Sequence, residues 1–168
     1  FKGLANIARA YAMPELRTIF LTSFFFNAGF GFFIAFFGLF LISKFHFNEA
    51  RIGNFFAWVG VCAILTQTFT TRKVAARFAE PQVLKISLLG VSCVMFAYLL
   101  APSPLWLFVI APISSTFNGL SLANMGGLLS RSVAPQVQGE ILGIGSSIAA
   151  LANSLPPLLG GVFAASFA

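Results

Sequence analysis

Four stretches of this chain contain no Asp, Glu, Lys or Arg: residues 18–43, 52–71, 86–130 and 141–168. About 20 consecutive apolar residues in a helix are enough to cross the hydrocarbon core of a bilayer. The composition agrees, because 58% of the residues are hydrophobic and the mean hydropathy is +0.93. Only 8% are charged, whereas roughly a quarter are charged in soluble domains. The sequence therefore predicts a membrane protein.

The longest of these stretches is too long for one membrane span. It is interrupted at Ala101-Pro102-Ser103-Pro104, where two prolines remove backbone donors and disfavour a continuous helix. The alternation of polar and apolar residues that a barrel strand needs is not visible. We therefore expect an all-α membrane protein with five transmembrane helices, at about 18–42, 52–71, 83–100, 105–130 and 140–165.

The basic residues predict how these helices are oriented. With the N-terminus in the cytoplasm, eight Lys and Arg residues face inward and two, Lys44 and Arg51, face outward. Cytoplasmic loops carry an excess of Lys and Arg, so this orientation is favoured. The net charge of +6 is then explained by topology, and we expect no nucleic acid partner.

The two ends of the chain look like internal positions of a longer polypeptide. The first residue is Phe1, the last residues are apolar, and five spans leave the termini on opposite sides of the membrane. We expect residues 1–17 to be the tail of a cytoplasmic linker and residues 18–168 to form a transmembrane unit. Pro14 and Glu15 suit the start of the first helix.

Ionisable groups are absent from the middle of the predicted spans. All four acidic residues lie at loops or helix ends, and the one histidine, His46, lies in the first outward loop. Cys62 and Cys93 fall in different spans and are expected to be small apolar fillers. The sequence therefore predicts no metal site, no cofactor and no nucleophile–base pair, which argues against an enzyme.

Small and polar residues recur at helical spacing on four of the five spans. Residues three and four apart share a helix face, and Ser23, Asn27 and Gly31 form one such stripe. The glycines favour close helix packing, whereas a buried amide needs a partner on another helix or a wet cavity. Both readings of the amides stay open here. The amides concerned are Asn27, Gln67, Asn118, Asn124 and Asn153.

Three segments resemble the C-terminal half of a major facilitator superfamily transporter, especially the drug:proton antiporter branch that includes tetracycline-resistance proteins. They are "MPELRTIFLTSFFFNAGFGFF", "RIGNFFAWVGVCAILTQTFTTRKVAARF" and "SRSVAPQVQGEILGIGSSIAALANSLPPLLGG". The first resembles the beginning of span seven, the second resembles span eight with its basic loop, and the third resembles span eleven. The chain departs from the pattern in that loop, where Thr71-Arg72-Lys73 and Phe78-Ala79 stand, and at Pro156, which stands where glycine is usual.

The resemblance implies that five of the six helices of one half are present and that the N-terminal half of the same transporter is a partner. It also implies alternating access, in which two halves rock about a central site. The first and fourth spans would then line a substrate cavity, with these candidates: Phe24, Asn27, Phe30, Gly31, Ser115 and Asn118. The second and fifth would pack against the other half or gate, with these candidates: Gln67, Asn153, Pro156, Pro157, Gly160 and Gly161. Arg72, Lys73 and Arg77 would form the cytoplasmic signature-like loop.

We therefore expect a multi-pass transporter of the cell membrane that exports amphiphilic drugs or small organic compounds with a proton gradient. Most phenylalanines of the first span are expected to face lipid, and Phe24 and Phe30 are the better substrate contacts. Uptake of a sugar or metabolite is one alternative, although it would need more polar recognition groups. A non-transporting membrane subunit is another.

Overall fold

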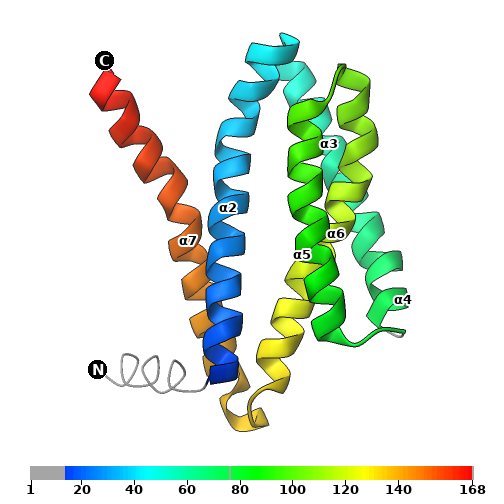
Figure 1. Cartoon of the computed structure of the whole chain (residues 1–168), viewed down its shortest axis with the longest axis vertical. Coiled ribbons are helices and arrows are strands. Elements are labelled where there is room, and N and C mark those ends of the chain that lie inside the picture. The colour runs from blue at the N-terminus through cyan, green and yellow to red at the C-terminus, as the bar shows by residue number, and fades with distance from the viewer. Residues whose placement is uncertain (1–13, 76, 168) are drawn as a thin grey trace. The chain divides into compact units, whose positions relative to one another are not determined.

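The computed structural model describes residues 14–75 and 77–167, without the side chains of residues 14, 15, 72, 75 and 161–167. All secondary structure in these ranges is helical (Figure 1). The α-helices are α2 (Pro14–Phe45), α3 (Glu49–Leu65), α4 (Thr71–Ala75), α5 (Glu80–Leu100), α6 (Pro104–Arg131) and α7 (Gln138–Phe167). A π-helical turn, η1 (Thr66–Thr70), joins α3 to α4, and a 3₁₀ turn, η2 (Pro135–Val137), precedes α7.

The prediction of an all-α membrane protein is confirmed. Among the described residues, five helical segments are long and apolar enough to cross a membrane, and each overlaps one of the five predicted spans. The helices extend a few residues beyond the charge-free stretches, into segments that carry polar and charged residues. Of the predicted linker, residues 1–13 lie outside the described residues, and Pro14 begins α2.

At the two helix ends beside the first loop, backbone groups that lack a helical partner are satisfied locally. Asn48 caps α3, because its side-chain oxygen accepts a hydrogen bond from the backbone N–H of Arg51 at 2.9 Å. Glu49 follows in the first turn, where the helix dipole favours an acid. His46, the residue that follows α2, has a left-handed backbone conformation with φ 52°. Its N–H donates to the carbonyl of Ile42 at 3.0 Å, which satisfies a carbonyl of the last turn.

The chain divides into two compact units. The central unit is Phe37–Asn124, which holds the end of α2, then α3, α4, α5 and most of α6. The terminal unit holds the described residues up to Phe36 together with those from Met125 onward, and so contains most of α2 and all of α7.

In the central unit, α3 and α6 are joined by polar contacts spaced along their length. The Ser115 hydroxyl donates to the carbonyl of Val59 at 3.4 Å. The hydroxyls of Thr66 and Thr116 are hydrogen-bonded at 3.3 Å. Such bonds hold membrane helices together where lipid gives no hydrophobic drive for association.

A further contact between these helices is explained by Pro112, which lies inside α6. A proline lacks the N–H that would bond to the carbonyl four residues earlier, here that of Phe108. The indole N–H of Trp58 on α3 donates to this carbonyl at 3.0 Å. Trp58 therefore satisfies the acceptor that the proline leaves open, as a helix in hydrocarbon requires.

The central unit also contains an aromatic cluster with rings from α2, α3, α5 and α6. The ring of Phe37 lies 5.1 Å from that of Tyr98 and 5.6 Å from that of Phe55, measured between centroids. Phe55 also meets Phe108 edge to face at 5.4 Å. Nearby, the Lys44 ammonium donates to the carbonyl of Leu99 at 2.6 Å, where α5 ends.

The terminal unit has its own apolar core and a close contact between the end of α6 and α7. Leu16, Phe20, Leu129, Ile141 and Ile144 form the core. A Cβ added to Gly145 would lie 3.0 Å from Leu129 Cδ1, so only glycine lets this side chain approach α7 so closely.

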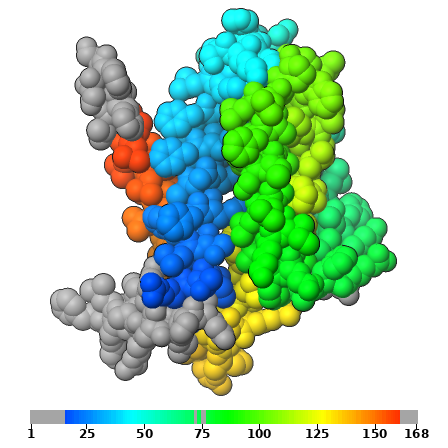
Figure 2. All heavy atoms as spheres, in the orientation of Figure 1, coloured from blue at the N-terminus to red at the C-terminus, as the bar shows by residue number. Residues whose placement is uncertain are grey.

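Large apolar side chains are exposed on every span. On α5 they include Leu89, which is 69% exposed, and Phe96, which is 67% exposed. The opposite face of α5 is buried in the central unit through Val91, Val94 and Tyr98. Figure 2 shows α5, in green, uncovered on one face of its unit. Such a surface suits hydrocarbon rather than water.

We predict that Trp58→Phe lowers the stability of the protein by about 1 kcal/mol, because the carbonyl of Phe108 loses its donor. The loss should shrink in a Pro112→Ala background, where the introduced alanine supplies the helical N–H. Thermal unfolding of the four variants in detergent gives the coupling energy. Trp106→Phe, at an exposed tryptophan, is the matched control and should unfold like the parent. Equal effects of Trp58→Phe in both backgrounds would contradict the explanation.

Candidate functional site

The predicted cavity residues of the first span lie in the terminal unit. Asn27 is half-buried on α2, and its amide NH₂ donates to the backbone carbonyl of Ser23 at 2.8 Å and to the Ser23 hydroxyl at 3.3 Å. Its donor group is therefore satisfied within its own helix. The sequence left open whether this amide finds a partner on another helix or faces a wet cavity. In the structure the partner of its NH₂ group lies on its own helix.

Phe24 and Phe30 flank this amide and are both half-buried. The ring of Phe30 stacks between those of Phe26, at 6.1 Å, and Phe33, at 6.3 Å. Phe24 meets Phe25 edge to face at 5.6 Å. These contacts form two groups of packed aromatic rings along α2.

Gly31 is the point at which α2 approaches α7. A Cβ at Gly31 would lie 3.1 Å from Asn153 Oδ1 and 3.3 Å from Pro156 Cγ. Pro156 is fully buried there, whereas Asn153 and Pro157 are exposed. The structure therefore brings together Gly31, Asn153 and Pro156, which the sequence assigned to two different roles.

The remaining candidates on α7 continue this contact. A Cβ at Gly160 would lie 3.4 Å from the Phe36 ring, so α7 stays close to α2 one turn further on. Gly161 lies outside the residues whose surroundings are described. The helix α7 continues through Pro156 and Pro157.

Ser115 and Asn118 lie on α6 in the central unit. Ser115 is buried and uses its hydroxyl on α3, as described above. Asn118 is half-buried, and its carbonyl oxygen Oδ1 is buried without a hydrogen-bond partner. An unpaired amide oxygen in an apolar interior costs about 1–3 kcal/mol. Such a group in a native protein calls for a role.

Asn124 provides the contrast on the same helix. It is buried too, but its NH₂ group donates to the carbonyl of Leu120 at 2.7 Å. Asn118 is the one side chain in the described part of the protein with a buried polar atom that lacks a partner. The two amides look alike in the sequence, and only the packing separates them.

Gln67 lies on the π-helical turn η1 and is exposed. A Cβ at Gly119 of α6 would lie 3.8 Å from Gln67 Cγ, so the turn packs against a glycine. Single π-helical turns within α-helices often accompany functional sites. Apart from its run of threonines, the segment carries no sequence signal for such a turn.

The basic loop follows η1 directly. Lys73 is exposed on α4, and Arg77 is exposed in the turn after it. Arg72 belongs to α4, but its side chain lies outside the described residues. Over the described ranges, three or more His, Cys, Asp or Glu residues never gather closely enough to hold a metal ion.

The sequence predicted neither the hydrogen bond from Trp58 to the carbonyl of Phe108 nor the packing of the Phe117 ring over Gly90. Pro112 did signal that the carbonyl of Phe108 needs a donor, but the donor lies 50 residues away on another helix. The sequence alone does not say which helix supplies it.

Comparison with known proteins gives distant relatives over nearly the whole chain. Mouse "Solute carrier family 22 member 18" is 23% identical over 165 residues, which is 98% of this chain and 40% of the relative. Human "Solute carrier family 67 member A1" is 25% identical over 167 residues, or 99% of the chain and 38% of the relative. "Tetracycline resistance protein, class H" of Pasteurella multocida is 28% identical over 123 residues, or 72% of the chain and 30% of the relative.

Over most of its length the chain is thus similar to proteins named as solute carriers and to one named as a tetracycline resistance protein. The chain spans about two fifths of the length of the solute carriers that it matches. No family model and no solved structure matches it. The relatives are carriers and a resistance protein rather than enzymes.

We predict that Gly31→Leu disrupts the α2–α7 contact, because even a Cβ is already crowded by Asn153 and Pro156. The expected loss is about 1–3 kcal/mol, typical of overpacking. Thermal unfolding in detergent measures it. Gly29→Leu is the matched control, since a Cβ there meets nothing within 4 Å. Similar unfolding of the two variants would remove the assigned close contact.

Proposed function

We propose that the chain is part of a secondary active transporter of the cell membrane that exports amphiphilic drugs or small organic compounds by alternating access. The observation that carries the proposal is the buried, unpartnered Oδ1 of Asn118 on an otherwise apolar span. A substrate that donates a hydrogen bond to this oxygen would remove the penalty of its burial. The similarity to a tetracycline-resistance protein favours export.

The aromatic surface of α2 would supply the apolar half of recognition. Phe24 and Phe30 would contact the ring systems or alkyl groups of an amphiphile, and Asn27 beside them would offer its amide oxygen. Pockets of this kind are mainly apolar, with a few polar groups that fix orientation. Gln67, Asn153 and Pro157, which are exposed, would serve packing or gating against the N-terminal half of the same transporter. Pro156 and Gly160 would act in gating through their contact with α2.

Energy coupling would rest on a group outside these spans. Within the described ranges, the acidic residues with known surroundings are Glu49, Glu80 and Glu140, which stand in the first turns of α3, α5 and α7. Their position at helix ends suits capping rather than proton transfer through the membrane. A proton-driven transporter would therefore carry its titrating carboxylate in the remaining part of the polypeptide.

Uptake of a metabolite is the second candidate. Its support is that two relatives are named solute carriers, a name that gives no direction of transport. Accumulation of a labelled metabolite in cells that express the full-length protein, with no change in drug tolerance, would favour uptake.

We predict that Asn118→Leu in the full-length protein impairs export while the protein remains folded. Because the replacement removes an unsatisfied acceptor, its unfolding temperature should match or exceed that of the parent. Drug accumulation in a susceptible host reports export, and thermal unfolding in detergent reports stability. Asn124→Leu, which removes a paired amide from the same helix, is the control and should export normally.

We expect Asn27→Leu to reduce export as well, with normal insertion in the membrane. Retention of full export by both Asn27→Leu and Asn118→Leu would remove the cavity assignment. Loss of export by Asn118→Leu together with a large fall in unfolding temperature would make Asn118 a structural residue instead.

A further inference from the structure

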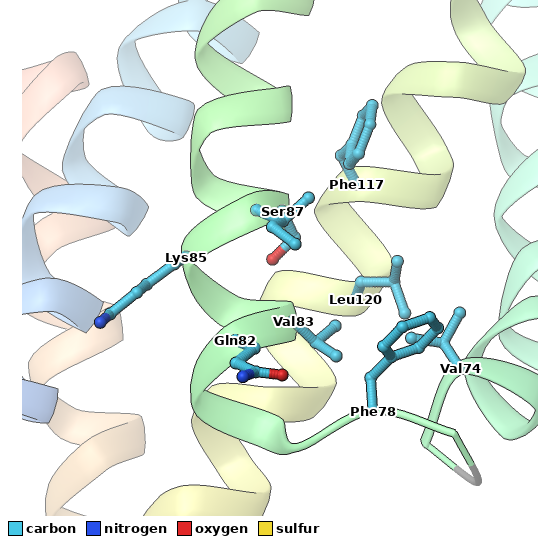
Figure 3. A pocket seen from close by; sticks show the side chains of 9 residues that line it. Val74, Phe78, Gln82, Val83, Lys85, Ser87, Phe117 and Leu120 are labelled. Carbon is cyan, nitrogen blue, oxygen red and sulfur yellow. The ribbon is translucent and has the colours of Figure 1, made fainter.

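The central unit contains an apolar cavity of about 550 Å³ between α4, α5 and α6 (Figure 3). Its apolar lining comes from Val74 of α4, Phe78 of the following loop, Val83 and Ile86 of α5, and Phe117 and Leu120 of α6. A volume of this size is typical of cavities that hold a small-molecule ligand. Asn118 is not among the lining residues, so the cavity is separate from the proposed substrate contact.

Two contacts between α5 and α6 hold one wall of the cavity in place. The ring of Phe117 packs directly over Gly90, where a Cβ would overlap it. The hydroxyl of Ser121 donates to that of Ser87 at 2.9 Å, and Ser87 donates to the carbonyl of Leu84 at 3.0 Å. Both hydroxyl groups are thereby engaged, so the cavity offers a ligand apolar surface with few polar partners.

The rim of the cavity is polar and basic. Gln82 and Lys85 of α5 border it, and in Figure 3 the Lys85 side chain extends away from the apolar lining. Val74 and Phe78 follow directly on Lys73 and Arg77, which are both exposed. Two of the lining residues thus directly follow an exposed cation in the sequence, and an apolar hollow bordered in this way complements a molecule with a hydrocarbon tail and a negative head.

The expected orientation of the chain supplies such a molecule. The segment from Arg72 in α4 to Lys85 near the start of α5 carries four basic residues and is predicted to face the cytoplasm. Anionic phospholipids are attracted to basic segments at this surface, and basic pockets between membrane helices bind their head groups. A free anion would not use the apolar cavity, and a neutral lipid would not use the charges.

We propose that this cavity binds an anionic phospholipid of the cytoplasmic leaflet. One acyl chain lies among Val83, Phe117 and Leu120, and the phosphate lies against Lys73 and Arg77. The proposal does not depend on the direction or substrate of transport. A lipid bound there would contact both the basic residues Lys73 and Arg77 and the apolar side chains between α4, α5 and α6.

The test uses the full-length protein, purified in detergent and freed of lipid, with native mass spectrometry as the readout. Phosphatidylglycerol and phosphatidylcholine with identical acyl chains are titrated in parallel. The proposal expects the parent protein to bind phosphatidylglycerol at least tenfold more tightly than phosphatidylcholine, with glycerol phosphate not binding detectably.

Two variants separate the roles of head and tail. Lys73→Gln with Arg77→Gln should weaken phosphatidylglycerol binding by about fivefold for each charge removed. These side chains are exposed, so the variant should fold. Val74→Trp should fill the cavity and abolish retention of the lipid. Arg51→Gln in the first turn of α3 and Leu89→Trp on the outer face of α5 are the matched controls and should bind like the parent.

Equal binding of the two lipids, or an unchanged preference in the Lys73→Gln/Arg77→Gln variant, would overturn the proposal. Binding of glycerol phosphate as tightly as the lipid would show a simple anion site and would also overturn it. Displacement of phosphatidylglycerol by an exported drug at equal concentration would assign the cavity to substrate instead. If Val74→Trp does not yield monodisperse protein, Leu120→Phe provides the cavity-filling variant with the same expected loss.

Discussion

The structure depends on the requirement that backbone polar groups in hydrocarbon find partners within the protein. Long α-helices meet this requirement automatically except where a proline interrupts the ladder or a helix ends. In the central unit, one position of each kind receives the missing group from a side chain on another helix. Trp58 donates to the carbonyl that Pro112 leaves open, and Lys44 donates to the carbonyl of Leu99 near the end of α5. The central unit is held together at the points where its helices would otherwise be incomplete.

The same requirement applies to side chains, and it separates structural polar groups from candidate functional ones. Asn27, Ser115 and Asn124 all have hydrogen-bond partners on their own or a neighbouring helix. Asn118 keeps a buried oxygen without one. Stability alone does not account for such an oxygen, because an apolar residue of similar size would avoid the penalty. The proposed transport function is therefore based on the polar group that packing fails to explain.

Much of the fold could be predicted from the distribution of charges. The charge-free stretches indicated the five spans, and the Pro102 and Pro104 pair marked the boundary between α5 and α6. Helical spacing also identified Gly31 as a position of close approach. The sequence could not show which amide would lack a partner, that η1 is a π-helical turn, or that Phe117 packs over Gly90 beside a cavity. The unpartnered amide and the Phe117 packing depend on contacts between residues on different helices, whereas periodicity reports only which residues share a helix face. The π-helical turn is a local departure from the α-helical hydrogen-bond pattern, which periodicity does not report either.

In this account the outer faces of the helices contact hydrocarbon, while Asn118 meets water and substrate during transport. Labelling of single cysteines by a water-soluble thiol reagent in intact cells tests this most directly, after Cys62 and Cys93 have been replaced by alanine. The expected result is that Asn118→Cys reacts, that an exported compound slows the reaction, and that Leu89→Cys on the outer face of α5 does not react. A Leu89→Cys variant that reacts as fast as Asn118→Cys, or an Asn118→Cys variant that never reacts, would contradict it.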